Sequence, residues 1–228
     1  MPGKKEDLSL RAGHRERLRQ NFLDDKLAKY ETLELLLSYA IPRRDVRPLA
    51  RALYNKFGGM FPILSASIDD LCTVRGMGRN TAIFIKVIQK ILLDGYECEL
   101  KDVPVLHNNQ QLYNYCKLML GRKQIEEVHI LYLDDLNRLI EDQLHSTGTY
   151  NCSALYDIEI AKHAISIGAQ GIIVVHNHPR PNTSFSSQDK EITTHLKDVL
   201  NAVGVKLIDH CLVSGDTLYS MVDLGIFQ

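Results

Sequence analysis

The sequence predicts an α+β protein in which an all-α first domain precedes a mixed α/β domain. Before residue 100, apolar residues recur at three- and four-residue spacings, which is typical of amphipathic helices. After residue 106, short β-type runs alternate with helical patterns. A charged stretch containing Pro104 separates the two regions. We therefore expect a helical domain at 1–98, a linker at 99–105 and an α/β domain at 106–228.

The first domain is expected to be a small helical bundle. Pro42, Pro48 and the pair Gly58-Gly59 punctuate its helical patterns, as residues that stop or start helices do. The predicted helices cover 32–40, 46–57 and 81–93.

The second domain is expected to contain a mixed sheet flanked by helices. The patterns predict, in chain order, a hairpin of strands at 127–134 and 138–145, a helix at 157–167 closed by Gly168, a buried strand at 171–176, a helix at 187–203, and strands on either side of the turn 214–216.

Composition limits the classes of protein that need to be considered. The chain has 228 residues, 45% of them hydrophobic, but lacks the run of about 20 apolar residues that a membrane helix needs. Its five cysteines are scattered and form no C-x-x-C pair, which favours free thiols in a reducing compartment. We therefore expect a soluble, cytoplasmic protein that does not enter a membrane.

Charge is distributed unevenly along the chain. Residues 1–100 hold 17 Lys and Arg against 13 Asp and Glu, whereas 101–228 hold 10 against 15, so the two parts carry +4 and −5. A basic first part is compatible with nucleic-acid binding but does not by itself establish it.

The stretch HNHP, directly after the apolar run GIIVV, contains the strongest candidate site. Residues two apart on a strand share a face, so His176 and His178 are expected to turn their imidazoles toward one point. Asp189, near the start of the next helix, is the expected third ligand, and a tetrahedral zinc would keep one open position for water. Ser186-x-x-Asp189 also matches a helix capping box, and the histidines have the alternative of hydrogen bonding only.

One more histidine, His210, follows Asp209 on a predicted strand. It is either a buried histidine at a strand end or an outer partner that orients a metal ligand.

These motifs resemble a known family. H-x-H, ten residues, then Asp, with Ser three before the Asp, resembles the JAMM metalloprotease signature of the MPN fold, which is cytidine-deaminase-like. HNHP with a polar loop and S-x-x-D is similar to the bacterial RadC family, historically labelled DNA repair proteins. The similarity extends to GHRERLR, VRGMGRNTA, EEVHILYLDDLNRLI and LIDHCLV, whereas Arg180-Pro181 and Phe185 depart from the family pattern in the loop.

The resemblance implies a zinc-dependent hydrolase of amide or isopeptide bonds. It places proton transfer on Glu127, with Glu126 as the alternative one residue earlier, and stabilisation of the oxyanion on Ser186. A nuclease that uses the same metal, or a non-enzymatic scaffold in a DNA-associated complex, remains as an alternative. The protein or peptide substrate is not identified by these residues.

Residues 67–93 resemble a helix-hairpin-helix module. The glycines allow a tight turn that directs backbone N–H groups, at the start of the second helix, toward a DNA phosphate. Gly78 in particular is expected to need a conformation that a branched side chain resists. Binding would be independent of DNA sequence, and packing or protein docking is the alternative. The expected DNA contacts are Arg75, Gly76, Gly78, Arg79 and Lys86.

Overall fold

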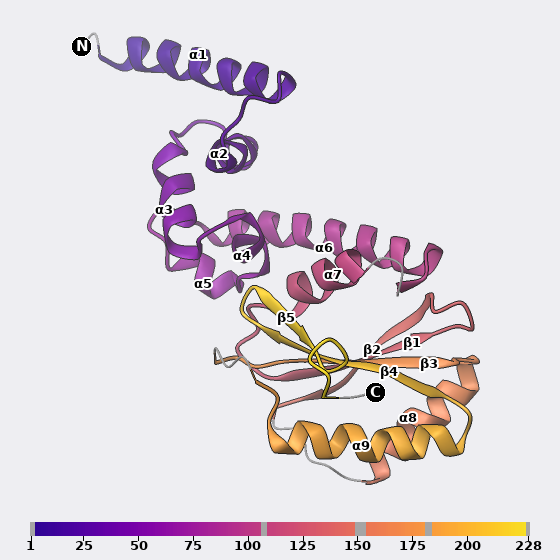
Figure 1. The fold of residues 1–228 in the computed structure, drawn as a ribbon. Helices are drawn as coiled ribbons and strands as arrows, with labels where there is room; N and C mark the ends of the chain where they lie inside the picture. Colours follow the sequence, from indigo (N-terminus) through magenta and orange to yellow (C-terminus); the bar gives the residue numbers. More distant parts are fainter. Residues whose placement is uncertain (1–2, 106–108, 149–153, 181–183, 227–228) are drawn as a thin grey trace. The chain divides into compact units, whose positions relative to one another are not determined.

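Two compact units make up this computed structural model, which describes residues 3–105, 109–148, 154–180 and 184–226. Contacts group Met1–Gln89 into one unit and Lys90–Gln228 into the other. The first unit is helical, and the second holds a five-stranded mixed sheet with helices (Figure 1). The expected order of a helical region followed by an α+β region is therefore confirmed.

The helical unit packs short helices around a leucine-rich core. Helix α3 has Pro48 in its first turn and ends at Phe57. The residue after it, Gly58, caps the helix with a φ of 85°, which is in the left-handed region that favours glycine. Fully buried side chains such as Leu37, Leu53 and Ile85 form the core. The helices of this unit are α1 (Gly3–Leu23), α2 (Lys29–Ala40), α3 (Arg47–Phe57), α4 (Met60–Ser65), α5 (Ile68–Cys72) and the first part of α6 (Arg79–Asp102).

Helix α6 extends further than the sequence pattern predicted. Helical structure was expected over 81–93 with a linker at 99–105, but α6 continues to Asp102, and the division between the units falls inside it. The polar segment stays helical because Glu97 and Lys101 pair at 2.7 Å one turn apart and because Leu100 is buried. Residues 99–102 are therefore helical rather than linker; the limits of independently folding domains stay a prediction.

The sheet of the second unit has the strand order β2-β1-β3-β4-β5. Only β3 and β4 pair in parallel, and the other neighbouring pairs are antiparallel. The expected hairpin, the buried strand and the pair of strands around residues 214–216 are all present. The elements are α7 (Asn109–Leu120), β1 (Glu127–Leu133), β2 (Leu139–Thr147), α8 (Ala154–Ile167), β3 (Gly171–Asn177), α9 (Ser187–Ala202), β4 (Lys206–Ser214) and β5 (Thr217–Ser220).

Helices cover both faces of this sheet (Figure 1). Successive side chains of a strand alternate between the two faces, so residues two apart lie on the same face. On β3, Ile173 and Val175 pack with α7, whereas Ile172 and Val174 pack with α8 and α9. His176 has the parity of Val174 and therefore lies on the α9 side.

Two expectations from the sequence concern membrane-spanning helices and the state of the cysteines. Among the described residues, no helix has both the length and the apolar character needed to cross a bilayer. Cys72, Cys98, Cys116 and Cys211 are free thiols, as the scattered positions predicted, while Cys152 lies outside the described residues.

Candidate metal centre

The carboxyl end of β3 brings two imidazoles together, as the sequence predicted. The Nε2 atoms of His176 and His178 lie 3.2 Å apart, and the His176 side chain is 2% exposed. Two nitrogens at about 2.0–2.1 Å from one tetrahedral ion would lie about 3.3–3.4 Å from each other. The spacing of the two rings therefore fits a shared metal ion.

Asp189 lies at the start of α9, close to both rings. Its Oδ1 is 3.7 Å from Nε2 of His176, and its Oδ2 is 3.8 Å from Nε2 of His178. The same Oδ2 accepts a hydrogen bond of 2.6 Å from the backbone N–H of Ser186, and Ser186 Oγ accepts one of 3.0 Å from the Asp189 N–H. The predicted capping box is therefore present, and it holds the Asp189 carboxylate beside the histidines.

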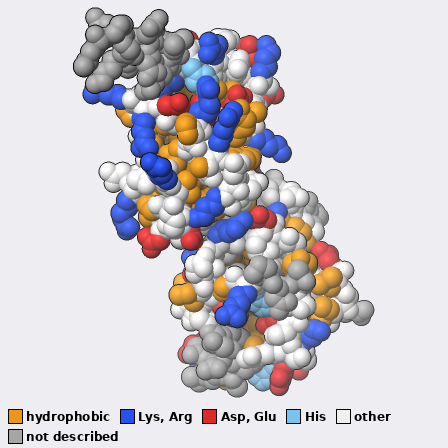
Figure 2. Space-filling view, turned by 90° about the vertical axis from the view of Figure 1, so that its left-hand side faces the viewer, with side chains coloured by type: hydrophobic (Ala, Val, Ile, Leu, Met, Phe, Trp, Pro, Cys, Tyr) orange, Lys and Arg blue, Asp and Glu red, His pale blue; other side chains and the backbone are white. Residues whose placement is uncertain are grey.

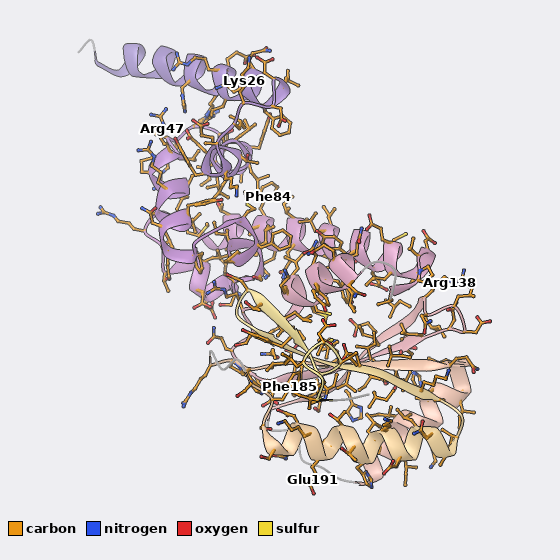
Figure 3. All side chains as sticks on the ribbon, in the orientation of Figure 1. Lys26, Arg47, Phe84, Arg138, Phe185 and Glu191 are labelled. Carbon is orange, nitrogen blue, oxygen red and sulfur yellow. The ribbon has the colours of Figure 1, made fainter. Side chains whose placement is uncertain are left out.

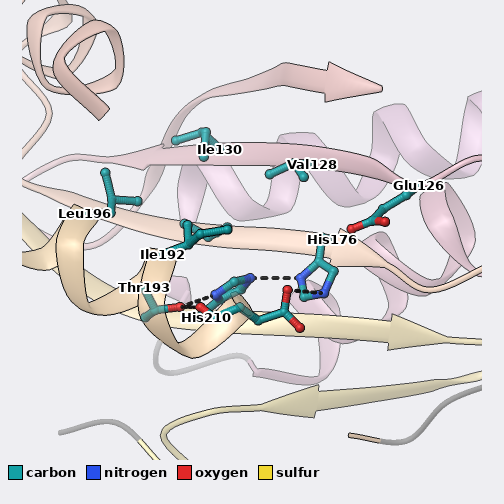
Figure 4. Close-up of a pocket in the computed structure, with 10 residues that line it drawn as sticks. Glu126, Val128, Ile130, His176, Ile192, Thr193, Leu196 and His210 are labelled. Atoms are coloured by element: carbon teal, nitrogen blue, oxygen red, sulfur yellow. Dashed lines mark hydrogen bonds and ion pairs between the residues drawn. The ribbon is translucent and has the colours of Figure 1, made fainter. Parts of the chain in front are cut away.

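Of the two adjacent glutamates before β1 and at its start, Glu126 is the one that faces the histidines. One oxygen of Glu126 and one ring nitrogen each of His176 and His178 lie within 4.8 Å of one another, a group that could hold a metal ion. Figure 4 shows the Glu126 carboxylate directed toward His176. Glu126 shares its face with Val128 and Ile130, which line the same cavity.

Glu127, the residue expected to handle protons, points to the opposite face, so its expected position is corrected. Its Oε1 accepts a hydrogen bond of 2.9 Å from Lys123 Nζ, and its Oε2 is 3.6 Å from Nε2 of His129. Adjacent residues of a strand point to opposite faces of the sheet. The alternative residue, Glu126, therefore lies on the face of the histidines.

Asn177 holds the backbone on both sides of Glu126. Its Oδ1 accepts a hydrogen bond of 2.9 Å from the Glu127 N–H, and its Nδ2 donates one of 3.2 Å to the carbonyl oxygen of Ile125. These bonds fix the backbone on both sides of Glu126 from a side chain that is itself buried. Strand alternation by itself indicates only that Asn177 points away from the histidine pair.

A chain of hydrogen bonds orients His176. Thr193 Oγ1 donates to the carbonyl oxygen of Asp189 at 2.5 Å, so this hydroxyl accepts from Nδ1–H of His210 at 2.6 Å. Nε2 of His210 then has a lone pair, which accepts from Nδ1–H of His176 at 2.8 Å. The network therefore places the lone pair of His176 on Nε2, facing the candidate metal position. Of the two interpretations of His210, the structure supports the outer partner.

The cavity beside these residues is small and largely apolar. Its volume is about 20 Å³, enough for one water molecule or one ion. Val128, Ile130, Val174, Ile192 and Leu196 line it together with the polar groups (Figure 4). Phe185 packs against the rings of His176 and His210, with centroid separations of 6.0 and 5.6 Å, and it closes the cluster near the start of α9 (Figure 3). Pro181 lies outside the described residues.

Burial shifts the pKa values of the central groups. It lowers the pKa of His176 to about 4 and the pKa of His210 well below its usual range, so both rings are neutral near pH 7, the form that binds metals. Burial also raises the pKa of Glu126; His178 opposes this rise and the Asp189 charge adds to it. A raised pKa suits a carboxylate that exchanges protons near neutral pH.

The second expected site, the turn between α5 and α6, differs in detail from the expectation. Gly76 has a φ of 98°, and a Cβ there would lie 2.7 Å from a guanidinium nitrogen of Arg44. Gly78 has no positive φ, and a Cβ on it would meet nothing within 4 Å. The position in this turn that requires glycine is therefore 76 rather than 78. The earlier expectation for Gly78 is wrong.

The basic side chains of this turn fall into two groups. Arg75 is exposed, and Arg79 is 70% exposed with only a 3.7 Å contact to Asp69. Lys86 instead donates to the carbonyl oxygens of Leu64 at 3.1 Å and Ala66 at 3.0 Å, at the end of α4. The charge of Lys86 is therefore used inside the helical unit rather than at an outer surface.

A helical unit followed by a five-stranded α/β unit with a His-His-Glu group defines an α+β protein with a candidate metal-binding domain. The RadC-like JAB domain family matches residues 106–226, and the chain belongs to this family. UPF0758 protein FN0909 of Fusobacterium nucleatum is 36% identical over 224 residues, an alignment that covers 94% of this chain and 97% of the relative.

Proposed function

We propose that the chain is a zinc-dependent hydrolase that cleaves amide or isopeptide bonds. The observation that carries this proposal is the convergence of His176, His178, Asp189 and Glu126 beside a largely apolar cavity, which Glu126, His176 and Asp189 help to line. Two neutral imidazoles and one carboxylate are the ligand set of catalytic zinc sites that keep a position open. A bound zinc ion would supply Lewis acidity and lower the pKa of a water molecule to about 7.

The protein side chains then have separate roles in the proposed reaction. His176, His178 and Asp189 would hold the metal, and Glu126 would accept a proton from the attacking water and deliver it to the leaving nitrogen. Ser186 would stabilise the developing oxyanion: its hydroxyl oxygen accepts from the Asp189 N–H, so its own proton can be donated to a substrate oxygen.

The direct test is metal analysis of the purified protein followed by parallel assays on peptide, isopeptide and nucleic-acid substrates. Hydrolysis of an amide or isopeptide that requires Glu126 is the expected result. Cleavage of DNA alone by the same metal-loaded protein would instead support the nuclease alternative. A protein that binds metal and cleaves none of these substrates would favour the scaffold.

Thr193→Val should weaken zinc binding by about 10- to 100-fold, the usual effect of removing an outer partner of a metal-binding histidine. Valine keeps the shape but removes the oxygen that accepts from His210, so the proton of His210 is no longer held on Nδ1. Chelator competition measures the affinity, and imidazole ¹⁵N shifts of the metal-free protein report the tautomers of His176 and His210.

Thr194→Val provides the matched control for this experiment. Thr194 is the next residue of α9, is exposed, and makes the same type of bond, from its hydroxyl to the carbonyl oxygen of Lys190 at 2.9 Å. Its replacement should leave zinc affinity and tautomers unchanged. Equal affinity in the two variants would show that the network does not orient His176.

We also propose that the helical unit binds DNA phosphates through the turn before α6, which places the hydrolase in a DNA-associated context. The exposed Arg75 and Arg79 flank the Gly76 turn, and backbone N–H groups at the start of a helix favour phosphate. Arg79→Ala should weaken binding equally for unrelated duplexes and reduce the slope of log K against log salt by about 1. Fluorescence anisotropy across a salt series measures both. A slope that does not change would remove Arg79 from the interface.

A further inference from the structure

A second cavity is lined by residues of the helical unit. It has a volume of about 230 Å³ and is lined by residues of α1, α2, the segment 44–46 and the start of α3. Figure 2 shows Lys and Arg side chains spread over the helical unit on the side it displays, and Figure 3 shows Arg47 at the start of α3. The charged side chains that line the cavity include Arg15, Arg17, Arg44, Arg47, Glu34 and Asp45.

Two of these arginines are held in place without losing their charge. Arg15 donates to the carbonyl oxygens of Ile41 at 3.1 Å, Arg44 at 2.8 Å and Pro42. The Arg44 guanidinium donates to the carbonyl oxygen of Gly76 at 3.4 Å. Carbonyl oxygens are neutral, so within the described part of the chain no carboxylate pairs with either guanidinium group, while the position of each is fixed. Such preorganised donors suit a bound anion.

The carboxylates of the cavity are already engaged. Glu34 is 2% exposed; its Oε1 accepts from Nε2–H of His14 at 2.7 Å and is 3.5 Å from Nε of Arg47. Asp45 Oδ1 accepts from the backbone N–H of Arg47 at 3.0 Å. Among the described residues that line the cavity, four guanidinium groups against two carboxylates leave two positive charges in excess, without counting His14. The balance of charge therefore favours an anion with more than one negative charge.

We propose that this cavity binds the terminal phosphate of a phosphate monoester. Guanidinium groups match phosphate oxygens in bidentate geometry, and a monoester carries about −1.5 to −2 charge at pH 7. A volume of 230 Å³ corresponds to several water molecules at about 30 Å³ each, which is room for such a group. A phosphodiester has a single charge, so it matches the two excess positive charges less well than a monoester does. The monoester is either a free nucleotide or the 5′-phosphorylated end of a nucleic acid.

The experiment uses the full-length protein and four probes: inorganic phosphate, a nucleoside 5′-monophosphate, and one oligonucleotide with either a 5′-phosphate or a 5′-hydroxyl. Saturable binding of the nucleotide by calorimetry is expected, together with preference for the phosphorylated oligonucleotide in fluorescence anisotropy. Competition between nucleotide and oligonucleotide shows whether they share the cavity, and their relative affinities identify the source of the phosphate.

Arg17→Ala should lower affinity for these phosphates by about 10- to 100-fold, the range for a hydrogen bond to a charged group. Arg17 is exposed, and its side chain has no hydrogen bond or ion pair within the described part of the chain, so the fold should be retained. The matched control is Arg19→Ala on the same helix, because Arg19 pairs with Glu16 at 2.8 Å and does not line the cavity.

Three results would overturn this inference. These are the absence of saturable nucleotide binding at low salt, equal losses in the two arginine variants, and equal affinity for the two oligonucleotides. Equal losses would indicate a diffuse basic surface in place of a site. Zinc content and hydrolysis do not enter the measurement, so failure here is distinguishable from failure of the proposed hydrolase.

Discussion

His178→Ala is expected to remove nearly all metal from the purified protein and to leave its fold intact. The variant loses one of two imidazoles whose Nε2 atoms are 3.2 Å apart, so the remaining groups cannot complete the ligand set. The loss in affinity should exceed the roughly 10- to 100-fold caused by changes to outer partners. Elemental analysis should find about one zinc per wild-type chain, as a single tetrahedral site requires.

The control for this loss is His163→Ala. His163 lies on α8, where Nε2 is 3.3 Å from the Glu141 carboxylate, outside the candidate metal centre. This variant should keep its zinc, and circular dichroism of both variants should match the wild type. A wild-type protein that remains metal-free after equilibration with zinc would contradict the metal site altogether.

Glu126→Gln is expected to abolish hydrolysis while zinc stays bound. Glutamine keeps the size of the side chain but cannot accept and return a proton, and such positioned groups typically contribute about 10²- to 10⁴-fold to rate. Glu127→Gln should retain activity, because Glu127 faces Lys123 and His129 on the other side of β1. Turnover and zinc content of the two variants are measured on the same preparations.

The Glu126→Gln and Glu127→Gln variants also distinguish two arrangements of the acidic side chains at the metal centre. If Glu126→Gln loses zinc, then Glu126 is itself a ligand in the His-His-Glu group and Asp189 acts mainly as the helix cap. If Glu127→Gln is inactive and Glu126→Gln is active, the assignment made from strand parity is wrong. Asp189→Asn completes the comparison, since the proposal requires this change to weaken zinc binding.

The sequence by itself determined the features that depend on local periodicity. The order of a helical region and an α/β region follows from spacings of three to four residues and of two, and the same period of two places His176 and His178 on one face. Local chemistry also predicted the capping box of Ser186 and Asp189. Such signals lie within a few residues of one another, so no tertiary information is needed.

Only the tertiary structure decided which acid and which partners join the site. The choice between Glu126 and Glu127 depends on the strand register, where Asn177, about 50 residues away in sequence, holds the backbone around them, because adjacent strand residues look equally suitable until the register is known. The contact of Thr193 and His210 and the cluster of Arg15, Arg17 and Arg44 likewise join separate segments. Periodicity states which face a residue shares with its neighbours, but packing alone determines what lies opposite that face.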